Sequence, residues 1–584
     1  MQPVGWTPWS AAGPPAGLIE QSRNLCDANE VIATSHQQPH HMTLALKAAL
    51  ALIALAIAMT RPELGEGAWR RCEQVLARLA KRRAACWIGM GLLVLFVRAV
   101  LLPVWPIPKP VIYDEFGYLL QADTFASGRL TNPPHQFWPF FESIYILQQP
   151  TYNAKYPPGQ GLALASGQLL FGHPWFGVWL SCGVLMATLC WALQGWLPPV
   201  WALFGAFLSL RLCLFSYWMN SYWGGAVAAI GGALVLGAYP RIVRQGRYVY
   251  AWLLGLGLVI LANTRPYEGL LYTIPIIIAL GFRRRTARVW TPVAACLPLG
   301  AVFILFYNDQ VTGHATQFPH VEYQKQYGYA PFFNFLSLEP LKTYRHESFF
   351  NLSHTWEFDH WARSRSWQLL IDRPKNWYLA LSTIAGGAVL LLVLIAVLPW
   401  MLRDKRIRLP VFATAAVVLG SFLQVVYYPH YAAPATGAML ILVVQAFRRL
   451  RQWRIAGRPT GPFLCRVAPT AAFLLFLGSE TARIYRRETP EQTQPVNARR
   501  DKVERALHDR ADGQHLIFVR YTGNQVPHEE WVYNRADIDA MAVVWAHDLG
   551  PAQNRNLIRY FHGRSIWMLQ PDTDPERLEP YIQP

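Results

Sequence analysis

Long apolar stretches separated by short polar connectors constrain this chain more than any other feature. Twelve such windows follow one another between residues 43 and 478. A helix needs roughly 20 apolar residues to cross a bilayer, and several windows are shorter than that. The windows are residues 43–59, 84–104, 161–194, 199–216, 221–239, 249–262, 268–282, 289–307, 378–400, 409–427, 431–447 and 463–478. They predict an all-α polytopic membrane domain of about 12 spans.

The composition agrees with a membrane protein. Hydrophobic residues make up 53% of the chain and charged residues 15%, which falls outside the balance of a soluble globular protein. The net charge is +18, and such a charge is also found in proteins that bind nucleic acid. The position of the basic residues therefore decides between these two classes.

Nearly all of the excess positive charge lies in five short connectors. They hold 23 Lys or Arg against 4 Asp or Glu. Short loops rich in Lys and Arg stay on the cytoplasmic side of a membrane, so the charge is explained without nucleic acid. The connectors are residues 60–83, 239–247, 282–288, 403–408 and 448–458.

Two long loops, residues 105–160 and 308–377, have balanced charge and are expected on the exoplasmic side, periplasmic or extracellular. This topology holds only if residues 161–194 cross the membrane once. We therefore interpret this window as a single crossing that is broken near Gly172, His173 and Pro174, since proline removes a helix donor. The prediction is a multi-pass protein of the plasma (inner) membrane.

The chain is expected to divide into three parts. Residues 1–42 form a disordered tail, residues 43–478 the membrane domain, and residues 479–584 a small soluble α/β domain on the exoplasmic side. In the last part, residues 515–521, 542–547 and 565–570 have the pattern of strands. The eight cysteines include no CxxC pair, so neither a disulfide framework nor a zinc site is indicated.

The first long loop begins with an adjacent pair of acidic residues, Asp114 and Glu115. One carboxylate of such a pair can act as a general base on an acceptor hydroxyl, while the other orients it or binds a divalent metal. Acidic residues are also favoured at helix starts, so Asp114 as the cap of a helix beginning near Phe116 is an equally good interpretation from the residues alone.

The same loop ends in TYNAKYPPGQG, which places Lys155 just before two prolines and the next apolar window. Pro157 and Pro158 disfavour helix at this point, so Lys155 is held at the membrane surface. An ammonium group there suits a lipid-linked phosphate. The alternative is an ordinary interfacial lysine whose head group reaches water.

These two features, in this order, resemble the GT-C superfamily of membrane glycosyltransferases, in particular bacterial relatives of protein O-mannosyltransferases and of the lipid A aminoarabinose transferase. The resemblance is specific over residues 105–194. It implies that Asp114 is the catalytic carboxylate, with Glu115 beside it, and that Lys155 contacts the donor phosphate. Tyr156 interrupts the Lys-Pro-Pro motif of that family and shifts Lys155 by one position.

Two further exoplasmic turns hold candidates for the donor-phosphate site. Arg265 offers a planar charged fork that matches phosphate oxygens, or it pairs with Glu268 at a helix entrance. His430 lies between prolines at the outer surface, where a structural role is the more common one. The long loop 308–377 is aromatic and polar and is a candidate cover for the acceptor site.

Together these features predict a membrane glycosyltransferase that moves a sugar from a polyprenyl-phosphate donor to an exoplasmic acceptor, which is a lipid, a glycan or a protein. The expected partners are therefore the donor, the acceptor and membrane lipids, with no nucleic acid. The family leaves a divalent metal cofactor open. The alternative is a transporter or lipid flippase, in which polar groups gather at mid-membrane. A membrane scaffold is a third class, and it leaves the acidic pair unexplained.

Overall fold

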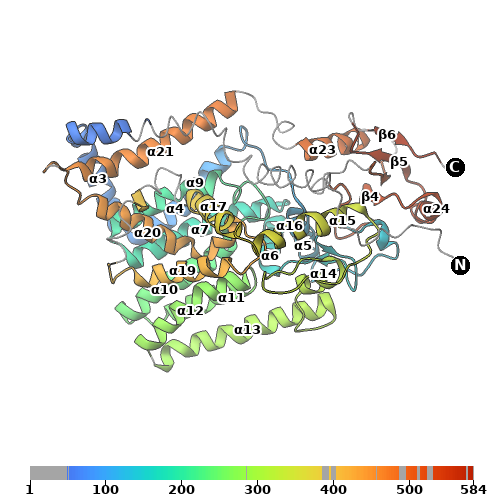
Figure 1. Cartoon of the computed structure of the whole chain (residues 1–584), viewed down its shortest axis with the longest axis horizontal. Coiled ribbons are helices and arrows are strands. Elements are labelled where there is room, and N and C mark those ends of the chain that lie inside the picture. The colour runs from blue at the N-terminus through green and yellow to red at the C-terminus, as the bar shows by residue number, and fades with distance from the viewer. Residues whose placement is uncertain are drawn as a thin grey trace.

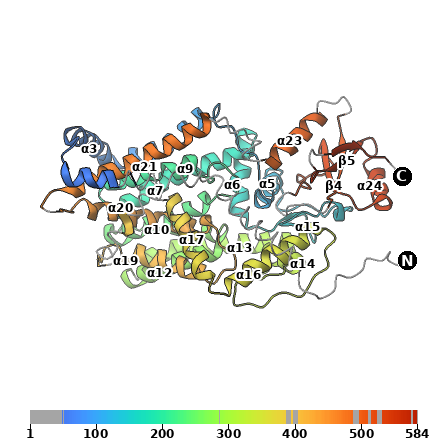
Figure 2. The same cartoon turned by 45° about the horizontal axis from the view of Figure 1, so that its top comes forward.

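The structure is a computed structural model of the whole chain. Residue placements are described for 49, 52–284, 286–384, 393–395, 403–455, 457–485, 495–508, 513–522, 530–573 and 577–582. The tail expected at residues 1–42 lies outside these residues. The described part is elongated, with a helical bundle over most of its length and a small sheet at one end (Figures 1 and 2).

The bundle is built from helices that alternate with short connectors. Six of them are long and apolar enough to cross a membrane: α4, α7, α10, α13, the segment Pro429–Leu450 that contains α20, and the first part of α21. Shorter apolar helices occupy Pro199–Phe215, Tyr250–Ala262 and Arg408–Ser421. The chain is thus mostly helical with several candidate spans, and the total of 12 stays a prediction.

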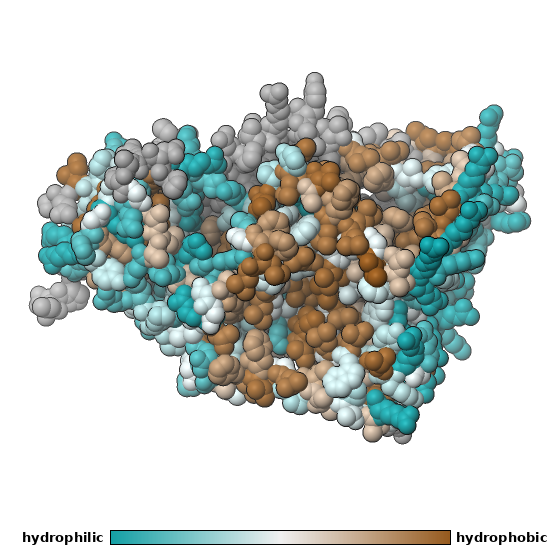
Figure 3. Space-filling view, turned by 180° about the vertical axis from the view of Figure 1, so that it is seen from behind, coloured by the Kyte–Doolittle hydropathy of each residue, from teal (hydrophilic) through white to brown (hydrophobic). Residues whose placement is uncertain are grey.

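The bounds of the bundle helices are α3 Glu66–Lys81, α4 Arg83–Val100, α7 Trp175–Trp196, α8 Pro199–Leu208, α9 Leu210–Phe215, α10 Ala226–Gln245, α11 Tyr250–Ala262, α12 Pro266–Arg283, α13 Ala287–Thr312, α19 Arg408–Ser421, α20 Thr436–Leu450 and α21 Thr460–Tyr485. Helix α10 lies in the centre, with 83% of its apolar window buried, whereas only 22% of the window of α13 is buried. Side chains of α13 therefore contribute to the broad hydrophobic band on the outside of the bundle, which polar surfaces flank on both sides (Figure 3). Such a band is what a helical protein presents to lipid.

The break expected near Gly172 is present. Helix α6 (Pro158–Phe171) ends there, and α7 begins at Trp175. The two helices fold back on each other, since a Cβ atom on Gly177 would lie 2.1 Å from the carbonyl oxygen of Ala163. Only α7 has the length and composition of a span, so the window contains one candidate crossing.

A layer of short elements covers one end of the bundle, and we call it the loop layer. It comprises α5 Tyr113–Ala126, η1 Trp138–Phe140, β1 Ile146–Leu147, β2 Asn153–Ala154, α6, α14 Pro319–Tyr327, α15 Glu347–Phe350, η2 Asn351–Glu357, α16 Phe358–Ser364 and η3 Pro429–Ala435. Helix α17, Leu369–Ile384, instead lies beside the bundle helices and contacts α9 and α20 (Figures 1 and 2). Segments of both long loops thus meet in this layer.

The C-terminal region contains α23 Pro495–His508, β3 His515–Val519, β4 Val543–His547, α24 Pro551–Tyr560, β5 Ser565–Gln570 and β6 Arg577–Pro580. The strands form one sheet in the order β4-β3-β5-β6. Strand β3 is parallel to β4 and β5, with His515 opposite Val543 and Ser565, and β6 is antiparallel to β5. The strands expected from the sequence are therefore present, and β6 is additional.

Candidate functional site

Helix α5 positions the acidic pair. Its N-cap residue is Ile112, so the helix begins before Asp114 and Asp114 is not its cap. Glu115 fills that role: its Oε2 accepts hydrogen bonds from the backbone N–H groups of Val111 at 2.6 Å and Ile112 at 3.2 Å. Its Oε1 accepts a third, from the N–H of Tyr222 at 2.9 Å. Glu115 therefore ties the start of α5 to the segment that follows α9.

Glu115 is buried, with 1% of its surface exposed, whereas Asp114 is half-buried. Burial raises the pKa of Glu115 to about 7, although its backbone hydrogen bonds oppose this shift. With both oxygens occupied by backbone donors, Glu115 is placed to hold the geometry of the site. Asp114, next to it, keeps an oxygen for other partners.

Asp114 lies against the tyrosine that interrupts the family motif. Its Oδ1 accepts a hydrogen bond of 2.7 Å from the hydroxyl of Tyr156, whose ring stacks on Tyr118 at 4.4 Å. Burial raises the pKa of Asp114, and the Lys155 ammonium, the Tyr156 hydrogen bond and the Arg265 guanidinium oppose that rise. Both predicted cations are therefore close enough to act on this carboxylate.

Lys155 is held above aromatic rings. The β1–β2 hairpin brings it there, because its N–H donates to the carbonyl of Tyr145 at 3.1 Å. Its Nζ lies 3.2 Å from the centroid of the Tyr145 ring and 5.1 Å from that of Tyr323. Burial lowers the pKa of Lys155 to about 8, and Asp114 and Glu357 oppose this shift. No carboxylate of the described residues forms an ion pair with Nζ, so the ammonium is available to an anion.

The two prolines that follow Lys155 lead into α6, whose start lies against the turn that carries Arg265. Pro157 is extended, and α6 begins at Pro158. The next N–H, that of Gly159, donates to the carbonyl of Asn263 at 2.8 Å, and a Cβ atom at residue 159 would lie 2.4 Å from Cγ2 of Thr264. Only glycine permits this contact, which places the start of α6 against the turn that carries Arg265.

Arg265 caps the start of α12, and its guanidinium lies 4.2 Å from the centroid of the Tyr431 ring. The alternative pairing with Glu268 is not formed within ion-pair distance: the buried Glu268 carboxylate instead accepts a 2.8 Å hydrogen bond from Gln424. Arg265 is half-buried.

His430 packs on Tyr431, the ring that Arg265 also contacts. It is buried in η3 among aromatic rings, with centroid distances of 4.5 Å to Trp223 and 4.9 Å to Tyr431. Its Nδ1 has no hydrogen-bond partner among the described residues. Tyr431 also lies under Arg265, so both His430 and Arg265 contact this ring.

Sequence reasoning missed the groups that bridge the predicted residues. In the sequence, Tyr156 is visible only as an interruption of the family motif, and no motif marks Tyr145, Tyr323 or Tyr431. Glu357, in η2, acts on Lys155; burial raises the pKa of Glu357 to about 7, and Lys155 opposes this. The long aromatic loop was expected to cover the acceptor site, and through Tyr323 and Glu357 it reaches Lys155.

The C-terminal region packs against α5. The ring of Tyr533 stacks on Phe116 at 4.1 Å, two residues from Asp114. The hydroxyl of Tyr152 donates to the carbonyl of Asn534 at 2.9 Å. The helix that carries the acidic pair is therefore held between the bundle and the C-terminal region.

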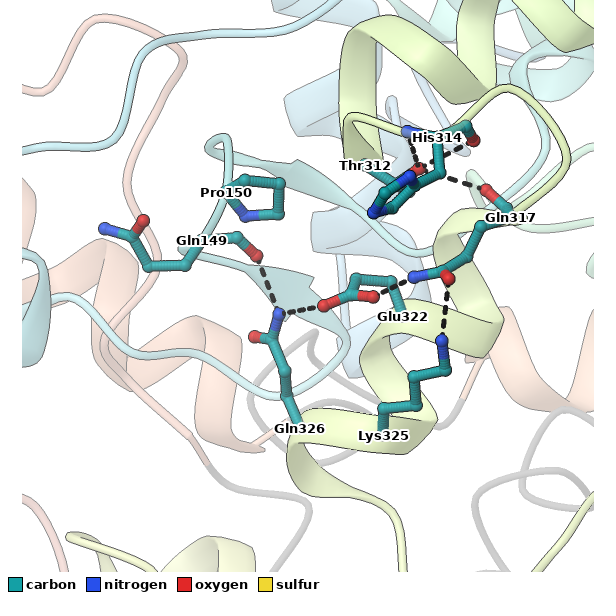
Figure 4. Close-up of a pocket in the computed structure, with 8 residues that line it drawn as sticks. All are labelled: Gln149, Pro150, Thr312, His314, Gln317, Glu322, Lys325 and Gln326. Atoms are coloured by element: carbon teal, nitrogen blue, oxygen red, sulfur yellow. Dashed lines mark hydrogen bonds between the residues drawn. The ribbon is translucent and has the colours of Figure 1, made fainter.

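A separate polar cavity of about 400 Å³ opens beside α14 (Figure 4). It is lined by Gln149, Pro150, Thr312, His314, Gln317, Glu322, Lys325 and Gln326. Its side chains bond to one another: Lys325 donates to Gln317 and Gln326 donates to Glu322, both at 2.6 Å. None of the predicted site residues lines this cavity. Within the described residues, no group of three or more His, Cys, Asp or Glu side chains is placed to hold a metal ion.

Of the comparisons with known proteins, the one with solved structures gives matches. No protein-family model and no curated protein matches the sequence. Fourteen chains of solved structures match. One is ArnT from Cupriavidus metallidurans in the apo state, with 15% identity and a TM-score of 0.46, over 82% of this chain and 93% of that one. The function proposed below is therefore argued from the side chains of the site.

Proposed function

We propose that this chain is a membrane glycosyltransferase that takes a sugar from a polyprenyl-phosphate donor. The observation that carries the proposal is the electrostatic arrangement around Asp114. This half-buried carboxylate is hydrogen-bonded to Tyr156 and lies within reach of the charges of Lys155 and Arg265. A base and two cations at one place are what the reaction needs, because a proton is taken up while a phosphate anion leaves.

In the proposed reaction, the oxygen of an acceptor hydroxyl attacks the anomeric carbon of the donor sugar. The bond between that carbon and the phosphate oxygen breaks, and the electron pair stays with the phosphate. Asp114 accepts the hydroxyl proton. Lys155 and Arg265 stabilise the phosphate as its charge develops. Charges balance, since one proton moves to a carboxylate and one anion leaves.

The remaining predicted residues, Glu115 and His430, act by positioning Asp114 and Arg265. Glu115 fixes the start of α5 and thereby the direction of Asp114, which makes it a positioning residue, and its direct participation stays a prediction. His430 supports the ring on which Arg265 lies. The acceptor approaches on the side of the long loop, and the site faces the periplasmic or extracellular side if the basic connectors are cytoplasmic.

A transporter or flippase is the alternative. It needs polar groups that line a path through the bundle. Asp114, Lys155 and Arg265 instead come together at one end of the bundle, in and beside the loop layer. This grouping favours the transferase.

The test is the substitution Asp114→Asn, which keeps the shape of the side chain and removes its proton affinity. Purified protein is given a panel of polyprenyl-phosphate sugars and an acceptor extract, and release of the carrier phosphate is followed. We expect a loss of about 10²–10⁴-fold in transfer. Asp309→Asn is the matched control, because Asp309 is an exposed carboxylate near the outer end of α13, outside the site. Full activity of Asp114→Asn would refute the assignment, and substrate flux into liposomes without turnover would favour the transporter.

A further inference from the structure

Helix α3 lies at the end of the bundle opposite the loop layer (Figure 1). It presents three chemically different faces. One face packs on the protein. Ala80 is 2% exposed, and Leu76 packs against the bundle core. Glu73 lies on this side as well, and it bonds to Arg451 at 2.9 Å and Arg466 at 3.1 Å. These contacts fix how the helix is rotated.

The second face is basic. At 3.6 residues per turn, Arg70, Arg71, Arg78 and Lys81 fall on one side of α3, and all four are exposed. Arg70 pairs with Glu66 at 2.9 Å. No other ion pair is formed by this face within the described part of the chain.

The third face is apolar and uncovered. Cys72, Val75 and Leu79 follow one another at intervals of three and four residues, which places them in one row. Val75 is 53% exposed and Leu79 is 52% exposed. A helix with one basic and one apolar face, fixed by a third face to a membrane bundle, has the pattern of a helix that lies in the membrane interface.

A cavity of about 420 Å³ opens at the N-terminal end of α3. It is lined by Thr60, Arg61, Pro62, Glu63, Leu64, Arg458 and Pro459. Nη1 of Arg458 donates to the carbonyls of Met59 at 2.7 Å and Thr60 at 3.0 Å, which joins the two segments that form the cavity. Arg61 is exposed, and its side chain has no hydrogen-bond or ion-pair partner among the described residues.

We propose that α3 and this cavity form a binding site for an anionic phospholipid. The guanidinium groups of Arg61 and Arg458 face the phosphate, and Leu64, Val75 and Leu79 contact the acyl chains. The location supports a lipid as the occupant, because the candidate spans α4 and α21 begin at Arg83 and Thr460, within two residues of the helix and of the cavity. Clusters of Lys and Arg at the end of a span attract anionic lipids. The proposal is independent of the transferase reaction.

The test uses the full-length protein in nanodiscs of phosphatidylcholine, with or without phosphatidylglycerol. A nitroxide is attached to Cys72, the exposed cysteine of α3, after Cys26→Ser and Cys296→Ser. Accessibility to oxygen and to a polar nickel complex reports the depth of the label. The matched control carries the label at Arg78→Cys with Cys72→Ser, which is on the basic face. We expect the Cys72 label to favour oxygen and the Arg78 label to favour nickel.

Retained phosphatidylglycerol is measured by native mass spectrometry of the same protein. Each basic side chain near an anionic surface contributes about fivefold to affinity, so Arg61→Gln with Arg458→Gln should lower retention roughly 25-fold. Arg403→Gln with Arg408→Gln is the control, because it removes the same charge from another basic connector. An equal loss in both double variants would overturn the site, since it would show general attraction only. Equal nickel accessibility of the two labels would overturn the lipid-facing assignment of α3.

Discussion

The pH dependence of donor use tests the role of Lys155. Burial lowers the pKa of this side chain to about 8, below the ordinary lysine value. The charged form is the one that binds a phosphate, so activity is present below this pKa and is lost as the pH rises through it. At about one pH unit above the pKa, roughly a tenth of the lysines stay charged, and kcat/KM for the donor should fall about tenfold from its plateau.

The two kinetic constants should respond differently. The profile of kcat/KM reports the free enzyme, in which burial keeps the pKa of Lys155 low. The profile of kcat reports the complex, in which the donor phosphate stabilises the ammonium and raises its pKa. The alkaline limb of kcat should therefore lie at higher pH than that of kcat/KM. Such a separation is not expected of a lysine that only anchors the loop at the membrane surface.

The informative substitution is Lys155→Arg, because arginine stays charged over the whole range. Its absolute rate should be lower, since a guanidinium fits the tyrosine rings differently, but the alkaline limb near pH 8 should disappear. The assay is initial-rate measurement with one donor at several concentrations, in matched buffers. A wild-type profile that is flat from about pH 7 to 10 would refute the reasoning, as would an unchanged alkaline limb in Lys155→Arg.

Three further predictions concern other parts of the molecule. Arg265→Lys should raise the donor KM about tenfold with a smaller effect on kcat, since lysine lacks the planar fork, and steady-state kinetics checks this. Tyr533→Ala should lower the free energy of unfolding by about 3 kcal/mol and reduce kcat, whereas Tyr533→Phe keeps the ring and should restore both, as thermal unfolding and kinetics will show. Cysteine labels within residues 320–340 should react from outside intact cells, and labels within 283–288 only after permeabilisation; the reverse result would invert the topology.

Much of the architecture follows from periodic properties of the sequence. The candidate spans α4, α10 and α13 coincide with apolar windows, because a bilayer demands uninterrupted apolar length. The strands β3, β4 and β5 could be recognised from short β-branched and aromatic runs. Side chains that meet across the loop layer have no such periodic signal. Their contacts depend on how distant segments fold together.

Glu115 and Asp114 illustrate this limit. They are adjacent in the sequence and chemically similar, and from the residues alone Asp114 could be either the base or the cap of the helix. Their surroundings differ because α5 begins at Tyr113, which turns Glu115 back towards the N–H groups of Val111 and Ile112. The third donor, from Tyr222, is more than a hundred residues away. No local pattern in the sequence predicts that hydrogen bond.

Tyr156 is the converse case. It departs from the family motif, and in the structure it contacts Asp114. An inserted tyrosine between the lysine and the prolines moves Lys155 one residue further from the start of α6. The structure accommodates this shift because the hairpin fixes Lys155 through Tyr145, while Gly159 fixes the helix start against Asn263. The tyrosine between these two fixed points then reaches Asp114 with its hydroxyl. Removing that hydroxyl in Tyr156→Phe would take away a hydrogen bond that stabilises the charged carboxylate, so the acid limb of the pH profile should move to higher pH.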